Sequence, residues 1–276
     1  MQQTAVITGG NSGIGLATAQ ALARQGWRVI ITGRDAEKLA AAATAIGGAA
    51  FRVADFASFE AVRALAGKLD AEPRVDVLIN NIGVALSGRR VSPDGNEMML
   101  QVNHLSPFLL TNLLLDKLKA SAPARIVNVA SRAHRGARDP GFDDFQFARS
   151  YNVSKAYART KLYNVLFTRE LARRLAGSGV TANALHPGVI RTQIGMDGDL
   201  SGIANLAWSL ILRWRGSAVE EGARVPVYLA TAPEVAGVTG KYFSTDCKEA
   251  APSVLAQDDA AARKLWEMSA KLVGVG

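Results

Sequence analysis

Two tyrosine–lysine pairs at the spacing i, i+4 are the side chains best suited to chemistry in this sequence. Tyr157 and Lys161 form one pair, and Tyr151 and Lys155 form another just upstream. Because residues i and i+4 share one face of a helix, either lysine ammonium can lie near its tyrosine hydroxyl. A free phenol titrates at about 10, and a nearby cation is expected to lower this pKa. Such a pair could serve as general acid and base near neutral pH.

Both pairs fall in one predicted helix, over roughly 150–176, which Gly177 and Gly179 end. Six residues turn a helix by about 600°, so the two pairs point about 120° apart and lie about 9 Å apart along the axis. Only one pair can therefore face a single reaction centre, and the spacing alone leaves the choice open.

A glycine-rich segment near the N-terminus indicates a phosphate-binding turn. Thr8-Gly9-Gly10-Asn11-Ser12-Gly13-Ile14-Gly15 follows the first apolar strand and precedes a helix. The glycines at 9, 13 and 15 allow a tight turn, close approach of the backbone to a pyrophosphate, and close packing of helix on strand. The helix N-terminus adds free N–H groups and the positive end of its dipole. Position and composition together favour a dinucleotide site over a simple turn.

Short runs rich in Val and Ile alternate with alanine-rich helical stretches along the chain. We predict strands at 5–8, 28–32, 51–54, 75–79, 125–129 and 180–185, with a last one at 241–244. Helices are predicted at 15–25, 36–46, 59–69 and 107–119, besides the long one. The alternation predicts right-handed βαβ units and an α/β fold. We expect a single-domain, Rossmann-like, doubly wound parallel sheet flanked by helices over 1–276, with its ligand at the carboxyl ends of the strands.

The glycine spacing resembles the TGxxxGIG signature of the short-chain dehydrogenases/reductases, and further motifs follow in that family's order. Asn80-Asn81-Ile82-Gly83 resembles the NNAG motif, with Ile82 in place of alanine, which puts a larger side chain beside the cofactor groove. The remaining matches are Asn103, Ser131, Tyr157 and Lys161. The resemblance covers nearly the whole chain and implies an oxidoreductase that interconverts an alcohol and a carbonyl with a nicotinamide cofactor.

The resemblance also decides between the two pairs. The run from Lys161 to Leu171 is similar to the retinol dehydrogenase branch, whose catalytic lysine opens that segment. That branch also has a long serine-to-tyrosine interval, as here. Tyr157 and Lys161 are therefore the expected catalytic pair, and Tyr151 and Lys155 are left with a surface or substrate-rim role.

The family pattern implies a role for each catalytic residue. Tyr157 is the expected acid when a carbonyl is reduced and the expected base when an alcohol is oxidised. Ser131 would hydrogen-bond the reacting oxygen, and Asn103 would kink the next helix and support a water relay. The nicotinamide supplies the hydride chemistry.

The end of the second predicted strand selects the cofactor. Thr32-Gly33-Arg34 lacks the acidic residue that holds the ribose hydroxyls in an NAD site. Arg34 can bind a 2′-phosphate bidentately, so NADP(H) is preferred over NAD(H); the alternative is a surface arginine at a helix start, and Asp35 adds a nearby carboxylate. Asp55 faces the adenine by resemblance or caps the helix that begins near Phe59. The expected cofactor-binding residues are Gly9, Asn11, Ser12, Gly13, Ile14, Gly15, Arg34, Asp55, Asn81, Gly83, Tyr157, Lys161, Pro187, Gly188, Val189 and Thr192.

Other features of the composition bound the class of protein. The formal charge of +8 is expected to reflect a solvated basic surface or attraction for anionic ligands or acidic lipid, with nucleic acid ranked last because the basic residues are scattered. A single cysteine and the absence of a basic, cleavable leader favour a cytoplasmic protein. Three histidines without ligand spacing predict no metal site. His186 is expected to be structural.

The stretch 194–216 is the least fixed by the fold and mostly apolar, which predicts a lid over a hydrophobic carbonyl or alcohol substrate. A core or subunit-contact helix, in a possible homo-oligomer, is equally compatible, and so is contact with a membrane surface. The apolar run 200–214 is shorter than the roughly 20 residues needed to span a bilayer. Two other functions fit the fold: a catalytically silent NADP(H)-sensing regulator, and an epimerase or dehydratase, for which the roughly 80 residues beyond Pro187 leave little room.

Overall fold

A computed structural model describes residues 2–188 and 218–275. Its centre is a seven-stranded sheet in the order β3-β2-β1-β4-β5-β6-β7, with every neighbouring pair parallel. The strands are β1 (Thr4–Thr8), β2 (Arg28–Gly33), β3 (Ala50–Val53), β4 (Val77–Asn80), β5 (Ala124–Val129), β6 (Val180–Leu185) and β7 (Tyr242–Phe243). The order reverses between β1 and β4, which is where a doubly wound sheet opens a crevice for its ligand.

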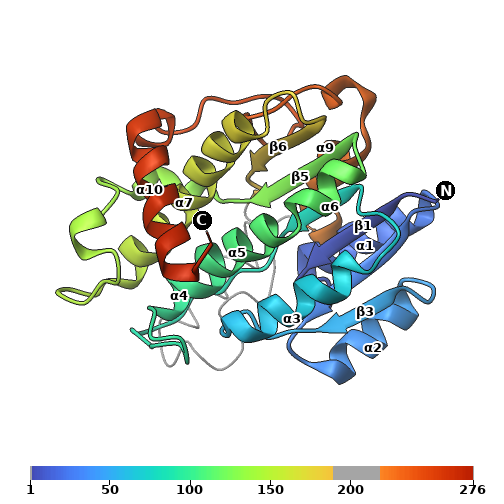
Figure 1. Cartoon of the computed structure of the whole chain (residues 1–276), viewed down its shortest axis with the longest axis horizontal. Helices are drawn as coiled ribbons and strands as arrows, with labels where there is room; N and C mark the ends of the chain where they lie inside the picture. Colours follow the sequence, from blue (N-terminus) through green and yellow to red (C-terminus); the bar gives the residue numbers. More distant parts are fainter. Residues whose placement is uncertain (1, 189–217, 276) are drawn as a thin grey trace.

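Helices cover both faces of this sheet (Figure 1). One face packs against α1 (Gly13–Arg24), α2 (Ala36–Ala45) and α9 (Val219–Thr231). The other packs against α3 (Phe59–Asp70), α5 (Ser106–Leu113), α6 (Leu115–Ala120), α7 (Val153–Arg174) and α10 (Asp259–Val273). A short α4 (Met98–Leu100) and a π-helical turn, η1 (Gln101–Leu105), lead into α5. The remaining elements are the 3-10 helices η2 (Arg132–Gly136), η3 (Phe142–Asp144), η4 (Pro233–Val235) and η5 (Val254–Gln257).

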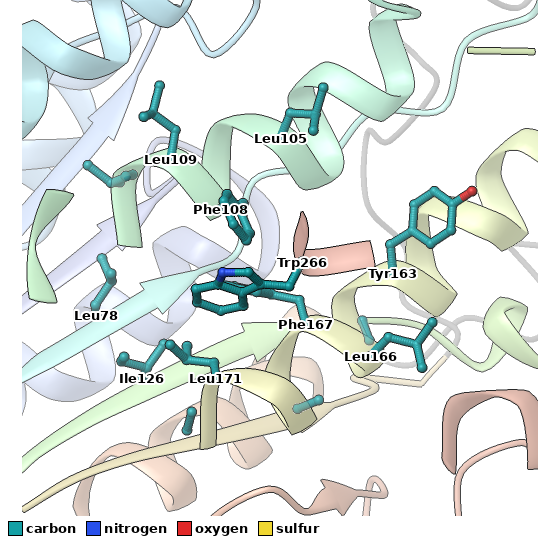
Figure 2. Packing of buried hydrophobic residues seen from close by; sticks show 14 of the residues in the cluster. Leu78, Leu105, Phe108, Leu109, Ile126, Tyr163, Leu166, Phe167, Leu171 and Trp266 are labelled. Carbon is teal, nitrogen blue, oxygen red and sulfur yellow. The ribbon is translucent and has the colours of Figure 1, made fainter. Parts of the chain in front are cut away.

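Aromatic side chains join α5, α7 and α10 in the hydrophobic cluster on their face of the sheet (Figure 2). The Trp266 ring of α10 lies 4.8 Å from Phe108 and 5.8 Å from Phe167, measured between centroids. Truncating such a buried aromatic costs about 3–5 kcal/mol, because transfer energy is lost and a cavity remains. This packing holds α7 against the sheet. Lys155 and Lys161, the lysines of the two tyrosine–lysine pairs, both lie in α7.

The predicted fold class is confirmed, and most predicted elements lie within one or two residues of the observed ones. Two helix predictions need correction. The helix predicted at 107–119 begins earlier, at Ser106, follows a π-helical turn, and is interrupted at Leu114 between α5 and α6. The helix predicted over 150–176 is shorter, because Asn152 caps it by accepting the Lys155 N–H at 3.0 Å.

The apolar stretch 194–216, predicted as a lid, lies outside the described residues. Within the described ranges, 2–188 and 218–275, no helix is both long and apolar enough to cross a membrane.

Candidate active site

The N-terminus of α1 presents main-chain N–H groups that no side chain caps. Its first helical residues follow Ser12, whose side chain accepts no capping hydrogen bond among the described residues, and no acidic residue lies in its first turn. By contrast, side chains cap α2, α3, α7 and α10. Unpaired N–H groups at the positive end of a helix dipole bind anions. This end of α1 is therefore suited to a phosphate.

The glycines of the turn have the geometry that a close approach requires. Gly9 and Gly13 have φ of +66° and +51°, in the left-handed region that disfavours side chains. A Cβ on Gly15 would lie 2.2 Å from the Gly9 carbonyl oxygen, so only glycine fits there. Gly15 thus lies behind the phosphate turn and packs helix on strand, while Gly9 and Gly13 line its open side.

A cavity of about 520 Å³ runs from this turn along the carboxyl ends of the strands. It contains the expected residues Gly9, Asn11, Ser12, Gly13, Ile14, Arg34, Asp55, Asn81 and Gly83, and also Ile82. Its outer end is lined by Arg34, Asp35 and Lys38, and its inner end by Val84, Leu86 and Met98. A turn that excludes side chains, an uncapped helix end and an elongated cavity fit a dinucleotide.

Both carboxylates whose roles the sequence left open have defined partners. Asp35 caps α2, because its Oδ1 accepts the Lys38 N–H at 3.0 Å. Asp55 does not cap α3; the cap is Ser58, whose Oγ accepts the Ala61 N–H at 3.3 Å. Asp55 instead accepts the Ala57 N–H at 2.9 Å and lines the cavity. This position leaves it available to a ligand.

Thr8 joins the phosphate turn to the end of β4, a role that the sequence analysis did not assign. Its buried Oγ1 accepts the N–H groups of Asn81 and Ile82 at 3.0 and 3.1 Å. The Asn81 side chain returns a hydrogen bond to the Thr8 carbonyl at 2.9 Å. A threonine at the end of a buried strand was the available signal, because its hydroxyl needs a partner.

Asn103 lies in the π-helical turn, in agreement with the expected kink. Its Oδ1 accepts the Val84 N–H at 2.7 Å, and its Nδ2 donates to the Val84 carbonyl at 2.9 Å and to Thr160 Oγ1 at 3.2 Å. A Cβ on Gly83 would lie 3.1 Å from Lys161 Nζ and 3.5 Å from Asn103 Oδ1. Gly83 therefore connects the cavity to the lysine.

Tyr157 and Lys161 lie in the N-terminal half of α7, and Ser131 follows the end of β5. Lys161 Nζ lies 5.7 Å from the centroid of the Tyr157 ring and donates to the Val129 carbonyl at 3.3 Å. A hydrogen bond joins the side chains of Tyr157 and Ser131. The predicted shared helix face is confirmed by this geometry.

The predicted direction of the Tyr157 pKa is wrong. Burial raises the pKa of Tyr157, and the hydrogen bond to Ser131 only partly opposes the rise. Lys161 is itself buried, 4% exposed, and burial lowers its pKa to about 8. Desolvation of the charged form therefore dominates the pKa shift of each group.

The second pair does not share the geometry of the first. Tyr151 precedes α7, so the i, i+4 relation to Lys155 does not bring their side chains onto one helix face. The Tyr151 hydroxyl instead donates to Glu97 Oε1 at 3.2 Å, and Lys155 is exposed. Burial and the Glu97 carboxylate raise the pKa of Tyr151.

His186 follows β6 and stacks on Tyr242, with ring centroids 5.5 Å apart. Burial lowers its pKa, so the ring is neutral at pH 7. Pro187 and Gly188, the latter at φ +92°, continue this turn, whereas the predicted cofactor residues Val189 and Thr192 lie outside the described residues. No group of three or more potential metal ligands occurs within 2–188 and 218–275.

An apolar cluster borders Tyr157. Leu86, Met99, Phe147 and Ala156 form its buried part, and Tyr157 packs against it. Phe147 is held at a φ of +49°, rare for a bulky residue, with Arg159 5.2 Å above its ring. Strain maintained beside reactive groups is typical of a functional site.

Comparison with known proteins agrees with this geometry. The family model described as short chain dehydrogenase matches residues 3–199. The chain belongs to that family. Human retinol dehydrogenase 13 is 47% identical over 99% of this chain and 85% of its own length. Human retinol dehydrogenase 12 is 43% identical over 98% of this chain and 86% of its own. The chain is thus a short-chain dehydrogenase of the retinol dehydrogenase-like branch, and an oxidoreductase.

Solved structures of the family have the same architecture. A crystal structure of an uncharacterised protein from Mycobacterium paratuberculosis is 34% identical, with a TM-score of 0.80, over 99% of this chain and 94% of that one. A Pseudomonas aeruginosa RhlG/NADP active-site complex is 30% identical, with a TM-score of 0.70, over 89% of this chain and 95% of that one. The family fold implies a nicotinamide cofactor.

Proposed function

We propose that this short-chain dehydrogenase interconverts a lipophilic alcohol and its ketone or aldehyde, with NADP(H) as cofactor and Tyr157 as general acid and base. The observation that carries the proposal is the position of Lys161. Its ammonium lies 5.7 Å from the Tyr157 ring, which interacts with Ser131, and next to Gly83, which lines the dinucleotide-sized cavity. A regulator that only senses the cofactor has no need of this arrangement.

Each of these residues has a distinct task in the proposed reaction. When bound, the nicotinamide donates or accepts the hydride. Tyr157 gives its phenolic proton to the developing alkoxide during reduction and takes it back during oxidation. The Ser131 hydroxyl hydrogen-bonds the same oxygen. The Lys161 ammonium stabilises the phenolate that Tyr157 becomes, and the Val129 carbonyl holds that ammonium in place at 3.3 Å.

The charges at the outer end of the cavity support NADP(H) over NAD(H). Arg34 is exposed there, Lys38 lies beside it, and the Asp35 carboxylate is bound to the first turn of α2. A 2′-phosphate gains charge-assisted hydrogen bonds in such surroundings. The relative RhlG, whose complex contains NADP, is consistent with this preference.

Replacing Arg34 by alanine should weaken NADPH binding far more than NADH binding. The lost contact is to a phosphate that only NADPH carries, and it is worth on the order of 1.5–3 kcal/mol. Titration of both cofactors against the wild-type and Arg34→Ala proteins measures the difference. An equal loss for both cofactors would remove Arg34 from the 2′-phosphate site.

The apolar cluster beside Tyr157 supports a lipophilic substrate. Leu86 belongs to both the cavity lining and the cluster, and Val84 and Met98, which pack against the cluster, also line the cavity. Apolar surface buried there stabilises a bound hydrocarbon by about 25 cal/mol per Å². The names of its relatives, the human retinol dehydrogenases, point to the same substrate class.

The test is steady-state NADPH oxidation with aliphatic, aromatic and polycyclic carbonyls matched in reactivity. We expect turnover whose kcat/KM rises with the apolar area of the substrate. Turnover confined to small polar carbonyls would contradict the substrate class. Tight NADPH binding without turnover across the panel would instead favour a sensor.

A further inference from the structure

A buried histidine, His134, hydrogen-bonds to the turn that carries Ser131. Ser131 precedes η2, and its Oγ accepts the Ala133 N–H at 3.1 Å. The Ser131 carbonyl oxygen accepts the His134 N–H at 3.2 Å and is 2.7 Å from His134 Nδ1. His134 is fully buried, so these bonds are not in competition with water.

The hydrogen-bond partners of His134 determine where its ring proton lies. The Ser131 carbonyl can only accept, so Nδ1 carries the proton. The Ser253 N–H can only donate, and at 3.1 Å it points to Nε2, which therefore has none. Burial also lowers the pKa of His134. The ring is a neutral bridge between the serine turn and the segment that precedes η5.

Packing and a second hydrogen bond reinforce the bridge. The Tyr242 ring meets the His134 ring edge-on, with centroids 4.9 Å apart. One residue further along the turn, the Arg135 guanidinium donates to the Ala251 carbonyl at 2.5 Å. Two consecutive residues after β5 are therefore attached to the segment around residues 251–253, more than a hundred residues later in the chain.

We propose that His134 is a positioning residue that sets the orientation of Ser131 toward Tyr157, an inference that rests on the proposed function. Through its Nδ1–H, it fixes the peptide plane that leads out of Ser131 and hence the direction of the Ser131 hydroxyl. Both of its ring nitrogens are engaged, so it transfers no proton itself. The segment around Ser253 thereby contributes to the active site without touching substrate or cofactor.

Substituting His134 by asparagine or by glutamine tests separately its hydrogen bond to Ser131 and its hydrogen bond from Ser253. In His134→Asn the side-chain N–H₂ can occupy the place of Nδ1 and keep the bond to the Ser131 carbonyl, while the bond from Ser253 is lost. In His134→Gln the longer side chain can place its oxygen near Nε2 and keep the bond from Ser253, while the bond to Ser131 is lost. Each variant loses one neutral hydrogen bond, so their melting temperatures should be similar.

We expect His134→Asn to stay within a few-fold of the wild-type kcat, and His134→Gln to lose about 10-fold or more, since misplacement by 1 Å can cost about 100-fold. The dissociation constant for NADPH should be unchanged in both. In a Ser131→Ala background, His134→Gln should cost nothing further, because the residue through which it acts is gone.

A purely structural histidine would give a different pattern. Equal kcat for His134→Asn and His134→Gln, or a His134→Gln cost that persists undiminished in Ser131→Ala, would overturn the inference. Ser131→Ala by itself tests the proposed function: wild-type activity in that variant would refute the role of Ser131. The two failures are therefore distinguishable.

Discussion

Tyr157→Phe should leave the fold and NADPH affinity nearly intact and lower kcat by about 10²–10⁴, the usual contribution of general acid–base catalysis. The substitution removes only the hydroxyl and keeps the ring, which packs against the cluster of Leu86, Met99 and Phe147. Stopped-flow NADPH oxidation gives the rate, and fluorescence titration gives the cofactor affinity. A loss of affinity as large as the loss of kcat would mean that the ring, and not the hydroxyl, was disturbed.

The matched control is Tyr151→Phe, which removes the same atom from the neighbouring motif. That hydroxyl contacts Glu97 at 3.2 Å and lies outside α7, so kcat should remain within a few-fold of wild type. Should Tyr151→Phe be the inactive variant and Tyr157→Phe the active one, the assignment of the catalytic pair would be reversed.

Replacing Lys161 by methionine should lower activity and raise stability together. The proposed phenolate loses its cation, which we expect to lower kcat by about 10²–10³, as loss of a preorganised electrostatic contact does. At the same time a buried ammonium disappears, and methionine fills a similar volume. The pKa of Lys161 falls from 10.5 to about 8 on folding, which corresponds to a cost of on the order of 1–3 kcal/mol once the lost bond to Val129 is subtracted.

The sign of this effect fixes its pH dependence. Between pH 8 and 10.5 the unfolded chain holds a proton on Lys161 that the folded chain has lost, so stability rises with pH in that window. Below about pH 8 both states are protonated and the full cost of burying the charge is present. The gain in melting temperature of Lys161→Met should thus be largest below pH 8 and vanish as pH approaches 10.5.

The same group should shape the pH profile of the wild-type enzyme. The kcat/KM for reduction, which reports the free enzyme, should fall as pH rises through about 8 and Lys161 loses its charge. The apparent value belongs to the Tyr157–Lys161 pair rather than to either residue alone. A profile that is flat to pH 9.5, or a Lys161→Met protein less stable than wild type at pH 7, would contradict this description of the lysine.

The sequence carried enough information for the sheet and for the elements of the site. Strands rich in Val and Ile, glycines at 9, 13 and 15, and a tyrosine four residues before a lysine are local signals. The structure places Gly9 and Gly13 on a cavity at the carboxyl ends of the strands, and Lys161 next to Gly83 of the same cavity. Side-chain partners distant in sequence carried no such signal. The hydrogen bond from Ser253 to His134 joins residues 119 positions apart, and no sequence pattern near either residue predicts it.

The direction of the Tyr157 pKa shift also could not be predicted from the sequence. The spacing of Tyr157 and Lys161 implies attraction between their charged forms, but it does not show that both are desolvated, and burial reverses the expected direction for the tyrosine. The roles of Asp35 and Asp55 depended on which of several nearby polar residues captured each helix end, a choice made by local backbone geometry.

The π-helical turn at Gln101–Leu105 limits where residues can be inserted or deleted in this chain. A π-helical turn holds one residue more than an α-helical turn. It therefore changes the direction in which the side chains before the turn point, relative to those after it. Here that offset allows Asn103 to hold the loop at Val84 while Phe108, on the next helix, stays in the core. Loss of one residue from this turn would restore a regular helix and swing one side of the segment by about 100°. The segment can accept substitutions. Its length is constrained, because the contact of Asn103 with Val84 and the burial of Phe108 must both be kept.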